Sequence, residues 1–117
     1  MPATTPISRA VATFALACTA HGVLAQQVDA DAARYVQFVQ DNAAMCVSRN
    51  AVEILVKSTH PSRTVRVWLD RYTAGVPTAD RSRTELKPRA EPEPLGCSRT
   101  PEGATQEWRI VRVQFSD

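Results

Sequence analysis

The sequence predicts a mainly β protein: a small antiparallel β-sandwich with one N-terminal helix and one disulfide. Three runs, residues 52–57, 64–72 and 106–115, alternate apolar and polar side chains as strands do. Turn-forming residues separate the short runs at intervals of about 8–12 residues, as in all-β folds. The 117-residue chain also begins with an export signal, which makes a disulfide possible.

Residues 1–25 have the pattern of a cleavable signal peptide. Arg9 supplies the positive charge, Ala10 to Ala20 form a short apolar segment, and 23–25 (Val-Leu-Ala) offer a cleavage site. Cleavage after Ala25 leaves 92 residues, enough for one domain. The sequence therefore predicts a periplasmic or secreted protein. A second reading, cleavage before a lipidated Cys18, stays open, although Ala15 stands where a lipoprotein signal usually has leucine.

Export leaves two cysteines, Cys46 and Cys97, in the mature chain. In an oxidising compartment they predict a single disulfide that closes a long loop. A domain of this size buries a modest fraction of its surface, so a covalent link would add substantially to its stability.

Residues 26–45 are expected to form an N-terminal helical segment ahead of a β domain at 46–117. Asp29 or Asp31 can cap a helix, and apolar residues recur at helical spacing through 29–44. The run 35–39 (YVQFV) also has strand-like composition. Whether this segment packs on the sheet or projects from it stays open.

The strands follow in order. Residues 52–57 and 64–72 are expected to pair as an antiparallel hairpin across the turn at 58–62, and 73–81, with Gly75 and Pro77, as a loop. Residues 82–87 read as a short polar edge strand. Three prolines in 87–94 exclude that segment from the middle of a sheet. A brief strand at 95–98 and a long one at 106–115 complete the domain.

Three segments of this pattern carry a resemblance to small exported bacterial immunoglobulin-like modules: VEILVKSTHPSRTVRVWL, ELKPRAEPEPLGC and EWRIVRVQF. Such modules often show a hydrophobic hairpin, a strand that ends in Leu-x-Pro, and a final strand. The resemblance implies an immunoglobulin-like sandwich. The sequence departs from these modules at Pro88-Arg89, where they often have Pro-Gly, and it shows no seventh strand. A fold of this kind does not define a function.

Charge and chemistry argue against several functions. Without Arg9 the chain has 13 Lys and Arg against 12 Asp and Glu, far from the basic excess of a nucleic-acid-binding protein. His60 is the only histidine after the signal, which leaves no ligand set for zinc, and no cofactor is expected. His60 as a general base beside Ser58 or Ser62 is the basis of a minor alternative, a small hydrolase. We expect no enzymatic activity.

The candidate binding residues lie on two strands. Period-two alternation places Arg66, Trp68 and Tyr72 on one face of 64–72, and Trp108 with Arg112 on one face of 106–115. Aromatic residues and arginine dominate binding hot spots. The sequence therefore predicts a non-catalytic module that binds a protein or cell-envelope partner through these five residues. Two alternatives stay open. In one, the N-terminal helix covers this face and the tryptophans are core; in the other, the protein inhibits a hydrolase through loop 73–81 or 88–95.

Overall fold

A computed structural model describes residues 27–116, so the predicted signal peptide and Cys18 lie outside the described residues. This part of the chain is mainly β, as the sequence predicts. Its elements, in order, are β1 (Gln27–Val28), α1 (Ala30–Ala33), β2 (Val36–Asp41), α2 (Ala44–Val47), β3 (Glu53–Ser58), β4 (Val65–Thr73), β5 (Val76–Leu86), β6 (Glu93–Cys97) and β7 (Gln106–Phe115).

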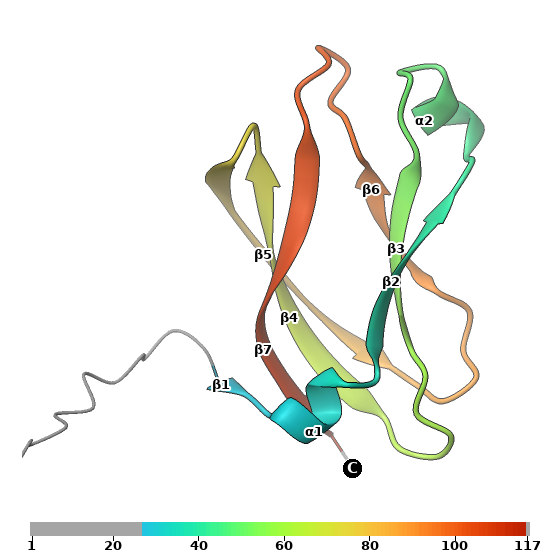
Figure 1. Cartoon of the computed structure of the whole chain (residues 1–117), viewed down its shortest axis with the longest axis vertical. Coiled ribbons are helices and arrows are strands. Elements are labelled where there is room, and N and C mark those ends of the chain that lie inside the picture. The colour runs from blue at the N-terminus through green and yellow to red at the C-terminus, as the bar shows by residue number, and fades with distance from the viewer. Residues whose placement is uncertain (1–26, 117) are drawn as a thin grey trace, which may run out of the picture.

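Two antiparallel three-stranded sheets face each other (Figure 1). One has the order β7-β4-β5 and the other β2-β3-β6. The two-residue strand β1 adds to the first sheet, parallel to β7 at Arg112 and Val113. Among these elements, no helix has the length and hydropathy needed to cross a membrane.

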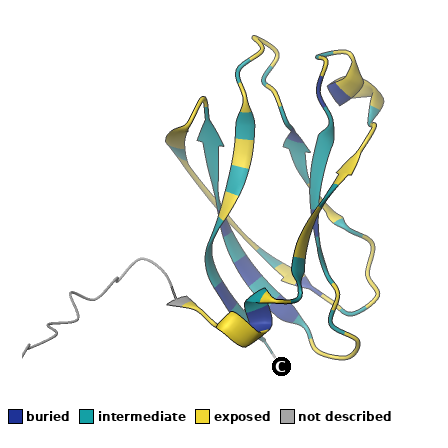
Figure 2. Ribbon diagram, viewed as in Figure 1, coloured by how far each residue is buried: buried dark blue, intermediate teal, exposed yellow. Residues whose placement is uncertain are grey.

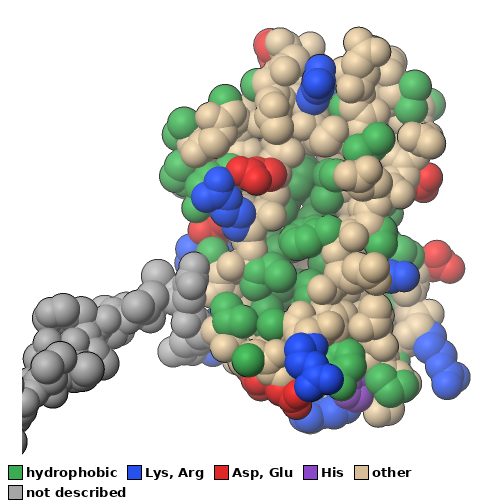
Figure 3. Space-filling model, in the orientation of Figure 1, with side chains coloured by type: hydrophobic (Ala, Val, Ile, Leu, Met, Phe, Trp, Pro, Cys, Tyr) green, Lys and Arg blue, Asp and Glu red, His purple; other side chains and the backbone are tan. Residues whose placement is uncertain are grey.

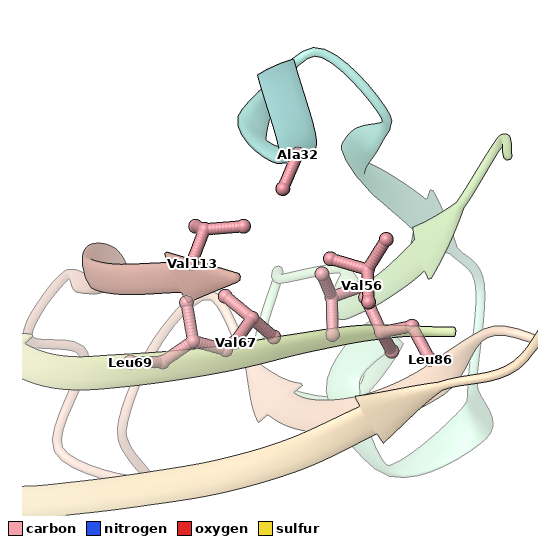
Figure 4. Close-up of a cluster of buried hydrophobic side chains, with 7 residues drawn as sticks. Ala32, Val56, Val67, Leu69, Leu86 and Val113 are labelled. Atoms are coloured by element: carbon pink, nitrogen blue, oxygen red, sulfur yellow. The ribbon is translucent and has the colours of Figure 1, made fainter. Parts of the chain in front are cut away.

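The core lies between the sheets at the end next to α1, where most buried positions gather (Figure 2). Apolar side chains from both sheets and from α1 meet there (Figure 4). The fully or nearly fully buried members are Ala32, Val56, Val65, Val67, Leu69, Leu86 and Val113. Three of them are alternate residues of β4, so the strand pattern read from the sequence identifies the inward face of this strand correctly.

The predicted N-terminal helix is wrong over most of its length. Asp29 does cap a helix, accepting hydrogen bonds from the backbone N–H groups of Asp31 and Ala32, but α1 ends at Ala33. The following residues form β2, which pairs with all six residues of β3. β-Branched and aromatic residues favour a strand once a partner strand is present, and this tertiary pairing outweighs the helical spacing.

The predicted hairpin of 52–57 with 64–72 is also wrong. Strands β3 and β4 lie in different sheets, and the six residues 59–64 cross between them. Both strands have one strongly apolar face, and Val56 of β3 meets Val65 and Val67 of β4 in the core. Two such strands bury more apolar surface face to face than side by side.

Residues 73–81 are not a loop. Ala74 and Gly75 form a two-residue turn with φ of 50° and 77°, and β5 begins at Val76. Positive φ at both central residues matches the right-handed twist of a tight hairpin. Pro77 is tolerated because β5 is an edge strand. The first segment of the inhibitor alternative, 73–81, is therefore a hairpin tip with the start of β5, and the second, 88–95, comprises most of the connection between β5 and β6 with the first residues of β6.

The disulfide predicted between Cys46 and Cys97 is present and joins α2 to the last residue of β6. With Ala51 these cysteines form a second, smaller buried cluster, separate from the main core. Large buried side chains are thus concentrated at one end of the two sheets, and a covalent link holds the other end.

Candidate binding site

The outward surface of sheet β7-β4-β5 gathers most of the predicted binding residues. Because directly paired residues point to the same side of a sheet, the register defines this surface, which we call the outer face. It is formed by four residues of β4 with their neighbours on β5 and β7: Arg66, Trp68, Asp70, Tyr72, Pro77, Arg81, Arg83, Glu85, Glu107, Arg109, Arg112 and Gln114.

One predicted residue, Trp108, does not belong to this face. Trp68 pairs with Arg112, but Leu69 pairs with Ile110, so Val111 is an extra residue on β7. Such a β-bulge shifts the alternation by one position. As a result Arg112 points outward, whereas Trp108 points inward. The strict alternation assumed from the sequence does not reveal this shift.

Trp108 instead packs against the main core and across to the opposite sheet. Its ring lies so close to Gly96 of β6 that a Cβ built there would be 3.1 Å from the ring. Its cross-strand neighbour Arg71 also points inward and is held by Asp80 (Nε to Oδ2, 3.0 Å) and Gln106 (Nη1 to Oε1, 2.7 Å). Trp108 is therefore a packing residue.

A hollow of about 440 Å³ lies beside Trp108, between the two sheets and next to the disulfide. Its apolar lining includes Met45 and Leu95, and Arg49 and Glu53 contribute charge. Hydrophobic side chains are visible along the middle of the molecule between the two sheets (Figure 3). No sequence pattern predicts this hollow, because its lining comes from α2 and from strands of both sheets.

Each aromatic residue of the outer face is in contact with an arginine of the same face. The guanidinium carbon of Arg112 lies 4.6 Å from the ring centroid of Trp68, and that of Arg109 lies 3.9 Å from the ring centroid of Tyr72. Both distances are within the range of cation–π attraction. Arg112 Nη2 also donates to Gln114.

Three ion pairs cross the same face. Arg66 donates to Glu85 at 2.6 and 3.0 Å, Arg81 donates to both oxygens of Asp70 at 2.6 and 2.9 Å, and Arg109 donates to Glu107 at 2.7 Å. The two hydrogen bonds from Arg81 lower the pKa of the Asp70 carboxyl below its usual 3.8, and they outweigh the opposing effect of partial burial.

This shift predicts a pH-dependent contribution to stability. Because the folded pKa of Asp70 is lowered, its contribution is complete above the usual value of 3.8 and is lost as the pH falls through the lower folded pKa. Urea unfolding at about pH 6 and about pH 3 should show that Asp70→Asn reduces this pH dependence. Glu102→Gln, which changes an exposed turn carboxyl, serves as the control. An unchanged pH dependence in Asp70→Asn would show that the pair does not stabilise the fold.

The described part of the N-terminal segment does not cover the outer face. Ala32 of α1 is part of the core, and Tyr35 and Val36 pack against the core from the inner side. Within residues 27–116, the ion pairs, hydrogen bonds and cation–π contacts of the outer face's side chains join residues of that face to one another. Four of the five predicted binding residues therefore share one surface, which the rest of residues 27–116 leaves uncovered. They are Arg66, Trp68, Tyr72 and Arg112.

His60 has contacts typical of a structural residue. Its Nδ1 accepts hydrogen bonds from the backbone N–H groups of Ser62 (3.1 Å) and Arg63 (2.8 Å). Its ring packs edge-on against Tyr35 and Phe115, at centroid distances of 4.4 and 5.4 Å. These contacts shape the crossing between the sheets. Within the described part of the chain, no cluster of three or more potential metal ligands occurs.

The chain was compared with protein-family models, curated proteins and solved structures. No protein-family model matches the chain, and neither a curated protein nor a solved structure matches it.

Proposed function

We propose that this protein is a non-catalytic binding module that holds another protein or a cell-envelope component on its outer face. The observation that carries the proposal is the grouping of Arg66, Trp68, Tyr72 and Arg112 on one face of the sheet, a face that the rest of residues 27–116 does not cover. Tryptophan, tyrosine and arginine contribute most to binding energy in interfaces, and residues on paired strands lose little conformational freedom on binding. The export signal predicted from the sequence supports a function in the periplasm or outside the cell.

An immunoglobulin-like topology is part of this proposal. The order β2-β3-β6 corresponds to strands A-B-E of that fold, and β7-β4-β5 corresponds to F-C-C′. The neighbour of β7 in such a fold is strand G, and here β1 occupies part of that position. Modules of this architecture serve many unrelated functions, so the fold supports the proposed function only by being compatible with it.

The test compares matched aromatic substitutions on different surfaces. The dissociation constant for a captured partner should be at least about 30-fold higher for Trp68→Ala than for the wild type. This factor corresponds to the ~2 kcal/mol that a hot-spot residue contributes. Phe38→Ala, at an exposed position of the other sheet, is the control and should bind normally. The measurement is the dissociation constant for the partner captured from the envelope extract of the source cells. Equal binding by the Trp68 variant would exclude the outer face as the site.

A further inference from the structure

The charges of the outer face divide into paired and unpaired groups. Its five arginines face three carboxylates, and each carboxylate forms an ion pair with one arginine. Two arginines, Arg83 and Arg112, have no carboxylate partner among residues 27–116. Both are the direct cross-strand neighbours of Trp68, one on β5 and the other on β7. The uncompensated positive charge is therefore concentrated in one row, Arg83–Trp68–Arg112.

We propose that this row binds a carboxylate side chain of an acidic segment in a protein partner, with an apolar group of the same segment on Trp68. This inference rests on the proposed function and names the chemistry of the partner. Arg83 and Arg112 lie on strands at either side of β4, so their backbones are roughly 10 Å apart. Two guanidinium groups at that separation can approach one carboxylate from both sides. Hydrogen bonds from arginine to a carboxylate are charge-assisted and therefore strong.

The rest of the face favours a protein over a polyanion. Asp70, Glu85 and Glu107 already neutralise three of the five arginines, so the surplus positive charge is confined to one row. A nucleic acid, a sulfated polysaccharide or an anionic membrane instead presents many evenly spaced charges, which need a continuous basic surface. A protein segment can place one or two carboxylates at the row and neutral or basic groups beside the paired carboxylates. Alternating charge of this kind contributes mainly to specificity.

The inference can be tested with peptides of defined composition. The probe is a 12-residue peptide that alternates Glu with Phe and Ser, and its counterpart has Gln in place of every Glu. NMR titration of the folded protein should shift the indole N–H of Trp68 and the Nε–H of Arg83 with the Glu peptide. The Gln peptide should bind at least tenfold more weakly.

Substitutions then locate the contact. Arg83→Gln combined with Arg112→Gln should weaken binding of the Glu peptide at least tenfold, whereas Arg99→Gln, which removes the same charge from an exposed loop residue, should leave it unchanged. A heparin fragment and vesicles containing anionic lipid are the competing ligands. Equal binding of the two peptides, no binding of either, or tighter binding of heparin or vesicles would overturn the inference.

Failure of this inference is distinguishable from failure of the proposed function. If the captured partner depends on Trp68 but not on Arg83 and Arg112, the outer face binds and only the acidic chemistry is wrong. If the partner is unaffected by Trp68→Ala, the outer face itself is not the site.

Discussion

Replacing Cys46 and Cys97 together by alanine should lower the free energy of unfolding by about 4 kcal/mol, as the chain-entropy model gives for a loop of this length. The two cysteines are 51 residues apart in sequence, and the disulfide restricts more than half of the described chain in the unfolded state. Small domains have total stabilities of roughly 5–15 kcal/mol, so the variant should be close to unfolding at 37 °C. Urea unfolding of the wild type and the variant measures the difference.

The loss of stability in the cysteine variant should also differ between the two ends of the molecule. The disulfide end contains only Cys46, Ala51 and Cys97 as its buried cluster, and the large buried side chains lie at the other end. Hydrogen exchange should therefore show lost protection first in α2 and β6, while β4 stays protected. Wild-type protein with its disulfide reduced is the control and should match the variant. An unchanged urea midpoint would show that apolar packing alone holds this end together.

Trp108→Ala should destabilise the fold by about 3 kcal/mol, the lower part of the range for removing a tryptophan from a core. Its ring packs against the main core and against Gly96 of the opposite sheet, so truncation removes contacts that link the two sheets. Trp68→Ala removes a ring from the outer face and should cost markedly less. Chemical denaturation of the two variants gives the comparison directly.

The same pair of variants separates packing from binding. Trp108→Phe should recover much of the stability lost in Trp108→Ala, because a smaller ring still fills part of the space. Partner binding should follow Trp68 and be insensitive to Trp108→Phe. If Trp108→Ala were as stable as Trp68→Ala, that result would contradict the conclusion that Trp108 points inward and packs between the sheets.

The features predicted correctly from the sequence depend on local pattern or on elimination. The apolar alternation of 64–72 identifies β4 and its inward face, and 106–115 matches β7 residue for residue. The Cys46–Cys97 pairing follows because only two cysteines remain after the predicted cleavage. The features predicted wrongly depend on partners. Residues 35–39 suit a helix and a strand almost equally, and their pairing with β3 decides between the two.

The binding site likewise could be predicted only where it does not depend on how the strands pair. Four of its five predicted residues share one face because the alternation is regular along β4 and through the last part of β7. Trp108 lies beyond the bulge, and a bulge depends on how two strands match in length and twist, which one strand's composition does not record. The surplus of positive charge beside Trp68 likewise becomes visible only when the register shows which arginines already have carboxylate partners.

The extra residue at Val111 sets which side chains of β7 each face receives. Deleting Val111 would leave Arg112 paired with Trp68 and Ile110 paired with Leu69, so the remaining side chains would keep their faces and only the bulge would be lost. If β7 instead kept Val111 and paired with β4 without a bulge, the first half of the strand would turn over. Trp108 and Ile110 would then face solvent, and Glu107 and Arg109 would be forced between the sheets. A deletion of Val111 should therefore be tolerated by both the core and the outer face.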